Sequence, residues 1–269
     1  MITTTTTGVA YRDEGAGEPA FLFLPGWCGP RTLFDPLIPR LAARSRILSP
    51  DWRGHGDSQP AVGDFGFSEL VDDAIAALDD AQVGVFVPVT AAHAGWAAIE
   101  LRRRLGAERV PGIVLLDWMV LGAPPPFREA LTAMMDPSIT REVVDQIATM
   151  WVAGLDIPDL KRYVKSMASM PDSMWGRAAR EIAHAFDIHG SPLHALSSFD
   201  PPPPTLHLYA QPPDPSYLEA QLDFATSHPW FRPIRLDAAS HFPAFEVPDA
   251  MAGFLEAFVS GLTQSTADL

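Results

Sequence analysis

Short hydrophobic runs alternate with helical patterns through the first half of the chain. Runs at residues 20–24, 45–48, 83–89 and 113–116 are short and rich in aliphatic and aromatic residues, which is typical of parallel strands covered on both faces. Residues 32–43, 67–78 and 94–105 place hydrophobic positions three and four apart, as amphipathic helices do. This alternation predicts an α/β fold with a mostly parallel, doubly wound sheet.

The pattern changes after residue 118. Residues 124–196 are helical in pattern and rich in methionine and tryptophan, which predicts an inserted helical cap. The proline run at 201–204 cannot lie inside a helix and marks the return to the sheet. Two strands at 205–209 and 231–236 and a last helix at 249–258 follow. We therefore expect core at 1–123, cap at 124–200 and core again at 201–269.

Composition narrows the function classes. The chain has 269 residues, 47% of them hydrophobic, which suits one domain with a large core. A net charge of -14 opposes nucleic acid and anionic membranes as partners. The single cysteine cannot form an intramolecular disulfide, and the first residues do not resemble a signal peptide. We expect a cytoplasmic protein that is a monomer or a weak homo-oligomer.

Residues 87–96 combine a strand, a turn of small residues and a helix start. This pattern is typical of a nucleophile elbow, in which small side chains, here Thr90 and Ala94, allow a sharp backbone turn. It also fits an ordinary strand-to-helix turn. The nucleophile position is occupied by Ala92, whose methyl group cannot attack a carbonyl carbon. We therefore expect no acyl-enzyme chemistry.

Two further segments lie where an α/β-hydrolase fold requires loops. Residues 22–27 are a strand that ends in a Gly-Trp turn, and residues 51–58 form a glycine-rich loop after the next strand. In this fold the backbone N–H groups of two positions, here Trp27 and His93, form an oxyanion hole. Because neither donor is a side chain, the hole can survive the loss of the serine.

His241 lies between the last predicted strand and the last helix, where this fold keeps its general base. A base of this kind needs a carboxylate that fixes its tautomer. Asp117 follows one strand and Asp214 follows a later one, and topology alone slightly favours Asp214. No metal-binding or nucleotide-binding motif is found, so we expect no metal and no cofactor.

The chain resembles the cofactor-independent dioxygenases of the α/β-hydrolase fold that cleave 3-hydroxy-4(1H)-quinolones. The resemblance extends from about residue 21 to residue 258. The segments that carry it are 24–28 (Leu-Pro-Gly-Trp-Cys), 52–56 (Trp-Arg-Gly-His-Gly), 64–66 (Asp-Phe-Gly), 116–118 (Leu-Asp-Trp), 175–177 (Trp-Gly-Arg) and 228–231 (His-Pro-Trp-Phe).

The resemblance implies roles for individual residues. It makes His241 the base and selects Asp117 as its acid partner, because the family's acid lies in the Asp-Trp segment. It makes Trp27 and His93 oxyanion-hole and substrate-contact positions, and Trp151 and Trp175 cap residues that line the pocket. Members of this family carry serine at the elbow, whereas this chain has Ala92, and residues 29–30 are Gly-Pro where those members have His-Asp.

The implied reaction uses a small aromatic substrate and O2, without a cofactor. A 2-alkyl-3-hydroxy-4(1H)-quinolone would be converted to an N-acylanthranilate and carbon monoxide. The cap is rich in methionine, which adapts to an alkyl chain but more often simply packs a core. A 2-heptyl substrate and a 2-methyl substrate therefore both stay open. So do two other interpretations, a non-catalytic protein that binds a small ligand, and a hydrolase if Ala92 is an engineered replacement of serine.

Overall fold

A computed structural model describes residues 2–267, and its centre is an eight-stranded sheet in the order β1-β2-β4-β3-β5-β6-β7-β8. The strands are β1 Ile2–Thr4, β2 Ala10–Glu14, β3 Ala20–Leu24, β4 Ile47–Pro50, β5 Phe86–Ala91, β6 Ile113–Leu116, β7 Thr205–Tyr209 and β8 Phe231–Arg235. The six strands β4, β3, β5, β6, β7 and β8 are parallel, and β2 pairs antiparallel with both β1 and β4.

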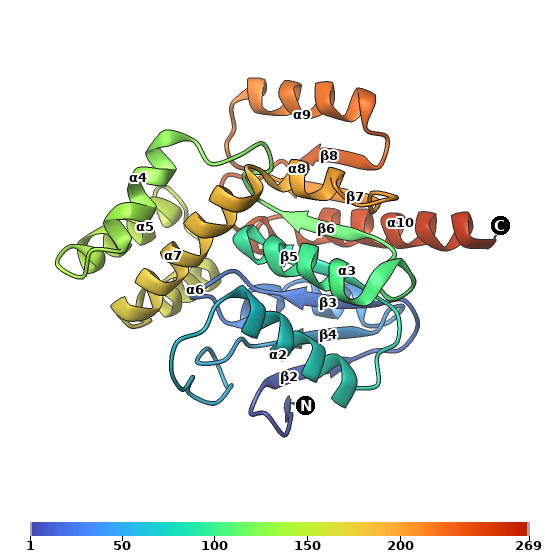
Figure 1. Cartoon of the computed structure of the whole chain (residues 1–269), viewed down its shortest axis with the longest axis horizontal. Helices are drawn as coiled ribbons and strands as arrows, with labels where there is room; N and C mark the ends of the chain where they lie inside the picture. Colours follow the sequence, from blue (N-terminus) through green and yellow to red (C-terminus); the bar gives the residue numbers. More distant parts are fainter. Residues whose placement is uncertain (1, 268–269) are drawn as a thin grey trace.

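Helices cover both faces of this sheet and one of its edges. They are η1 Arg31–Phe34, α1 Ile38–Leu41, α2 Phe67–Asp80, η2 Ala92–Ala94, α3 Gly95–Arg109, α4 Pro125–Met134, α5 Thr140–Val152, α6 Pro158–Ala168, α7 Asp172–His189, α8 Pro192–Ser197, α9 Pro215–Ser227, η3 Pro243–Phe245 and α10 Pro248–Ala267. In Figure 1, α2 and α3 lie in front of the sheet and α10 lies behind it. The predicted α/β fold with a mostly parallel sheet is confirmed.

Helices α4 to α8 lie between β6 and β7 in the chain, in the segment where the cap is predicted. Figure 1 shows α4 to α7 gathered beyond the carboxyl ends of the parallel strands. The strand register brings these ends together, since Leu24 pairs with Thr90, Ala91 with Leu116, and Leu116 with Leu208. The loops that follow β3, β5, β6 and β7 therefore leave the sheet side by side beneath the cap.

Several predicted elements differ from the observed ones. The single helix predicted at 32–43 is wrong, because Pro36 lies between two short helices, η1 and α1, and Pro39 lies in the first turn of α1, where proline is tolerated but the helix cannot continue backward. The strands predicted at 45–48 and 83–89 begin later, at Ile47 and Phe86. Strands β1 and β2 and helix α9 were not predicted. Of the residues within the described range, no helix is both long and apolar enough to span a bilayer.

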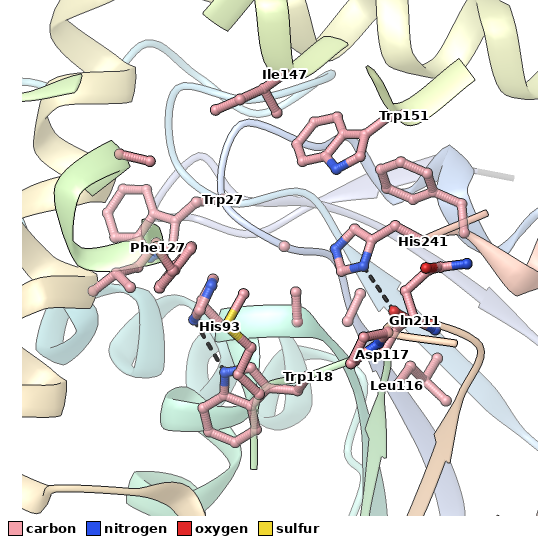
Figure 2. Close-up of a pocket in the computed structure, with 18 of the residues that line it drawn as sticks. Trp27, His93, Leu116, Asp117, Trp118, Phe127, Ile147, Trp151, Gln211 and His241 are labelled. Carbon is pink, nitrogen blue, oxygen red and sulfur yellow. Dashed lines mark hydrogen bonds and ion pairs between the residues drawn. The ribbon is translucent and has the colours of Figure 1, made fainter. Parts of the chain in front are cut away.

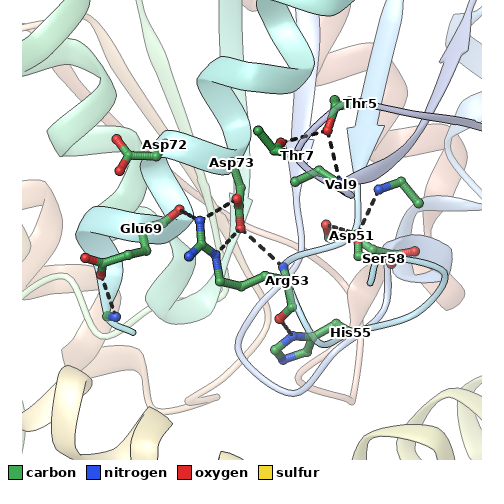
Figure 3. A network of polar contacts seen from close by, with 12 residues as sticks. Thr5, Thr7, Val9, Asp51, Arg53, His55, Ser58, Glu69, Asp72 and Asp73 are labelled. Carbon is green, nitrogen blue, oxygen red and sulfur yellow. Dashed lines mark hydrogen bonds and ion pairs between the residues drawn. The ribbon is translucent and has the colours of Figure 1, made fainter. Parts of the chain in front are cut away.

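The glycine-rich loop after β4 braces the turn that carries Trp27. Arg53 donates from Nε and Nη2 to the carboxylate of Asp73 on α2, at 2.7 Å each (Figure 3). His55 Nε2 accepts the backbone N–H of Cys28 at 3.1 Å, so its Nδ1–H donates to the Arg53 carbonyl at 2.9 Å. Because Nε2 accepts, the ring is neutral, and burial lowers the pKa of His55 accordingly.

The first residue of α3 is a glycine for a packing reason. A Cβ added to Gly95 would overlap Cζ3 of Trp118, whereas a Cβ on Gly253, in the exposed interior of α10, would meet nothing within 4 Å. We expect Gly95→Ala to lower the free energy of unfolding by about 1–3 kcal/mol through overpacking. Gly253→Ala should raise it by about 0.5–1 kcal/mol, since alanine favours helix. Urea unfolding measures both, and equal effects would contradict the packing role of Gly95.

Candidate active site

A cavity of about 1110 Å³ is lined by residues from the carboxyl ends of the strands and from helices α4 to α7. Its lining is mainly apolar, and it includes every residue for which the sequence predicts a site role. These residues are Trp27, Ala92, His93, Asp117, Trp151, Trp175 and His241. The structure thus places them around one space, and their roles stay predictions.

The most polar part of the cavity is a histidine–carboxylate pair. His241 Nδ1 lies 2.8 Å from Asp117 Oδ1, and Asp117 Oδ2 accepts the backbone N–H groups of Ala210 at 2.7 Å and Gln211 at 3.3 Å. Because the carboxylate can only accept, Nδ1 of His241 carries a hydrogen and Nε2 of the neutral ring has a free lone pair. Figure 2 shows this second nitrogen on the cavity side of the ring. The arrangement can take a proton from a bound molecule.

Asp214, the alternative partner, has a different place. It is the N-cap of α9, where its Oδ1 accepts the backbone N–H of Ser216 at 2.9 Å. Among the described residues it forms no hydrogen bond or ion pair with His241. The structure therefore brings Asp117, rather than Asp214, to the histidine.

The loop that carries His241 is fixed on two sides. Glu246 accepts the backbone N–H groups of Ala239 at 3.0 Å and Ser240 at 2.8 Å, which closes the turn before the histidine. From the cap, Trp151 stacks on the imidazole with 5.8 Å between ring centroids and 17° between planes. The position of His241 therefore depends on the core loop and on the cap together.

Backbone strain is concentrated at this site. Ala92, Cys28 and Asp117 have φ of 46°, 63° and 47°, in the left-handed region that costs a non-glycine residue about 1–2 kcal/mol. All three lie in, or next to, the loops that line the cavity. Such strain persists where the surrounding structure enforces it and gathers at functional sites. The sharp turn expected of a nucleophile elbow is therefore present at Ala92, although the nucleophile is not.

His93, the next residue, lies in the first turn of η2, where backbone N–H groups have no partner within the helix. Its side chain accepts a hydrogen bond at Nδ1 from Nε1–H of Trp118, at 3.0 Å. Phe127 stacks on the ring with 5.1 Å between centroids. Burial, followed by the proximity of His241, lowers the pKa of His93 to about 3. This side chain is neutral under ordinary conditions.

The sequence did not reveal the side chains that hold Trp118. Its backbone N–H donates to Nε2 of His207 at 3.3 Å, and its carbonyl accepts the hydroxyl of Tyr217 at 2.9 Å. His207 in turn bonds Gln221 through Nδ1 at 2.6 Å. Tyr217 and Gln221 lie on α9, the helix that was not predicted. The Leu-Asp-Trp motif was the one signal that pointed to this region, and it singled out Asp117 alone.

Among the described residues, there is no cluster of three or more His, Cys, Asp or Glu side chains that could hold a metal ion. The polar side chains that line the cavity are two histidines, one carboxylate, four tryptophans and the side chains of Arg128, Tyr163, Gln211, Tyr217 and Ser240. Two of the indoles, Trp27 and Trp175, have buried Nε1 atoms with no hydrogen-bond partner among the described residues.

Comparisons with known proteins agree with this geometry. Residues 21–254 match the model of the alpha/beta hydrolase family. A 2-heptyl-3-hydroxy-4(1H)-quinolone dioxygenase of Mycobacteroides abscessus is 37% identical over 94% of this chain and 96% of that protein. A 1H-3-hydroxy-4-oxoquinoline 2,4-dioxygenase of Pseudomonas putida is 34% identical over 94% of this chain and 96% of its own length.

Solved structures are similar in the same way. An AqdC variant in complex with its substrate, solved to explain recognition and ring cleavage of the Pseudomonas quinolone signal, superimposes with a TM-score of 0.92. It is 35% identical, and the match covers 97% of this chain and all of that one. An esterase of Thermogutta terrifontis, at 22% identity and a TM-score of 0.76, shares the fold alone.

The buried ring of His207 makes stability depend on pH. It is fully buried, and its pKa is lowered from about 6.5 to about 4 by burial. Below pH 6.5 the imidazole of His207 binds a proton in the unfolded chain but not in the folded protein. The free energy of unfolding therefore falls by up to about 1.4 kcal/mol per pH unit until pH 4. His207→Gln should remove this contribution. Urea unfolding between pH 7.5 and 4.5 measures it, and parallel profiles of the two proteins would contradict it.

Proposed function

The chain belongs to the 3-hydroxy-4-quinolone dioxygenases of the alpha/beta hydrolase family, and from this membership we propose that it cleaves a 2-alkyl-3-hydroxy-4(1H)-quinolone with O2 to an N-acylanthranilate and carbon monoxide. The observation that carries the proposal is the His241–Asp117 pair at a cavity where alanine occupies the nucleophile position. The resemblance predicted from the sequence motifs is confirmed.

The first step is the removal of the 3-hydroxyl proton. Nε2 of His241 has the free lone pair, and Asp117 holds the opposite nitrogen, so the imidazolium that forms lies beside a buried carboxylate. In a mainly apolar cavity the attraction between imidazolium and substrate anion is strong, because little water screens it.

The backbone N–H groups of Trp27 and His93 would stabilise charge on a ring oxygen. Trp27 follows β3 and His93 follows β5, whose ends the sheet register places together. Both donors are fixed before the substrate arrives, so they need no rearrangement as charge develops. This function requires no serine hydroxyl, which fits the alanine at residue 92.

The anion then reacts with O2 directly. An electron-rich conjugated anion gives an electron to O2, and the two radicals combine as a peroxide at C2. The terminal oxygen adds to C4, and cleavage of the O–O, C2–C3 and C3–C4 bonds expels C3 as carbon monoxide. The product is an N-acylanthranilate carboxylate, and the proton taken up by His241 passes to solvent, so atoms and charge balance.

The cavity supports a substrate with an alkyl chain. Its volume of about 1110 Å³ exceeds the range of about 300–1000 Å³ that is common for small-molecule sites. Of the cap methionines, Met134, Met150 and Met167 line it, whereas Met135, Met170 and Met174 do not. A relative named for a 2-heptyl substrate is 37% identical to this chain over 96% of its own length. A 2-heptyl group is therefore favoured over 2-methyl. Cytoplasmic location and a monomeric or weakly associated state stay predictions.

The proposed function is tested by mixing protein with 2-alkyl-3-hydroxy-4(1H)-quinolones in the presence of a chelator. Without O2, the spectrum of the bound substrate should become that of its anion. Admission of air should then consume O2 and release one carbon monoxide per substrate. His241→Ala should lower kcat by a factor on the order of 10² to 10⁴. Binding without O2 uptake by the unmodified protein would instead favour the non-catalytic ligand-binding protein.

A matched pair of substitutions separates the two aspartates. In Asp117→Asn, the side-chain oxygen still accepts the backbone N–H groups of Ala210 and Gln211, so the NH2 group faces Nδ1 of His241. Nδ1 must then accept, and the hydrogen of the neutral ring moves to Nε2, which leaves Nε2 unable to take a proton. We expect a loss in kcat on the order of 10² to 10⁴. Asp214→Asn keeps an N-cap acceptor and should change kcat less than twofold. Comparable losses in the two variants would contradict the assignment of Asp117.

A further inference from the structure

The cavity contains two histidines whose tautomers are opposite. His241 has its hydrogen on Nδ1, because that atom faces the carboxylate of Asp117. His93 has none on Nδ1, because that atom faces the indole N–H of Trp118, which can only donate. A neutral ring has one hydrogen, so in His93 it is on Nε2. One ring therefore offers the cavity a lone pair, and the other offers a hydrogen-bond donor.

Trp118 is held firmly enough to impose this state. Its ring is 2% exposed and lies against Gly95, where no Cβ intervenes. Trp96 meets it edge to face, with 5.0 Å between centroids and 90° between planes. His207 and Tyr217 bind its backbone N–H and carbonyl. The indole N–H therefore has one direction open to it, toward His93.

The other nitrogen of His93 is left for a ligand. Nε2 forms no hydrogen bond with any described residue, and His93 lines the cavity. In Figure 2 the dashed line joins one ring nitrogen to Trp118, and the second nitrogen points away from Trp118. The ring's neighbours, Phe127 and Phe186, are apolar, so they offer Nε2–H no acceptor.

We propose that Trp118 is a positioning residue that fixes His93 as its Nε2–H tautomer, so that His93 donates a hydrogen bond to the oxygen next to the one that His241 deprotonates. The proposal rests on the proposed function for the identity of the substrate. His93 would then donate two hydrogen bonds, one from its side chain and one from its backbone N–H.

A vicinal hydroxyl and oxo group matches this pair of rings. The 3-hydroxyl donates to the lone pair of His241, and the 4-oxo oxygen accepts from Nε2–H of His93. No proton is transferred to or from His93. As the anion forms, its charge spreads onto the 4-oxo oxygen and strengthens this hydrogen bond. A neutral donor suits this place, because a second imidazolium would repel the one that forms on His241.

The test compares Trp118→Phe with Trp96→Phe. Phenylalanine at residue 96 keeps an aromatic ring against Trp118, and the substitution removes an Nε1–H that has no partner among the described residues. Phenylalanine at residue 118 keeps much of the ring packing and removes the N–H that faces His93. Long-range ¹H–¹⁵N spectra of histidine-labelled protein report which nitrogen of His93 carries the hydrogen. We expect one tautomer in the unmodified protein and in Trp96→Phe, and a mixture in Trp118→Phe. We also expect kcat/KM to fall roughly tenfold in Trp118→Phe, as for loss of one hydrogen bond, and to stay within about twofold in Trp96→Phe.

His93→Leu completes a double-mutant cycle. If Trp118 acts through His93, Trp118→Phe costs nothing further once His93 is leucine. If Trp118→Phe lowers kcat/KM equally with histidine and with leucine at residue 93, Trp118 is merely structural and the proposal is overturned. An unchanged His93 tautomer in Trp118→Phe also overturns it. The spectra do not depend on turnover. A protein that is inert toward every quinolone but shows the tautomer change would contradict the proposed function and retain the role of Trp118.

Discussion

The carboxylate of Asp117 is bound on both of its oxygens, and the rest of the site depends on this. A buried charge is tolerated only when hydrogen bonds compensate for lost water, and here backbone N–H groups of the loop after β7 do so at Oδ2. They leave Oδ1 directed at His241. The left-handed conformation of Asp117 aims the side chain across the edge of the sheet, so a strained residue, two strand ends and the base form one unit.

The elbow at Ala92 separates two properties that a hydrolase combines. The strained turn and the N–H groups that follow it belong to the backbone, whereas nucleophilic attack belongs to the side chain. Alanine keeps the first and removes the second. What remains is the proposed base His241, the carboxylate of Asp117 that holds its Nδ1, and the proposed backbone donors, in a mainly apolar cavity. That set is sufficient to form and hold an organic anion, which is all that the proposed reaction with O2 asks of the protein.

The sequence was informative where burial alone determines structure. Strands β3, β6 and β7 lie at the predicted residues, because a continuous apolar run has few alternatives in a sheet covered on both faces. Strand β1 was not predicted because it is exposed at the sheet edge, and β2, the next strand, was not predicted because three of its five residues are charged. In α9 the fully buried residue is Gln221, and the hydrophobic residues that pack on the core are only partly buried, namely Tyr217, Phe224 and Ala225. A polar residue therefore interrupts the apolar stripe of this helix. Asp214 followed by Pro215 is the pattern of an N-cap and a first helical residue, and it is the one local signal for α9.

The side-chain relay from His207 through Trp118 to His93 was beyond sequence reasoning for a different reason. Its members come from β7, from the loop after β6 and from η2, and nothing in their local patterns says which ring nitrogens meet. Yet this choice decides the electrostatics of the cavity. With His93 neutral and donating, the positive charge that forms during the proposed reaction is confined to one ring, beside Asp117. The substrate oxygens then meet one acceptor and fixed donors, so the direction of proton transfer is set before the substrate binds.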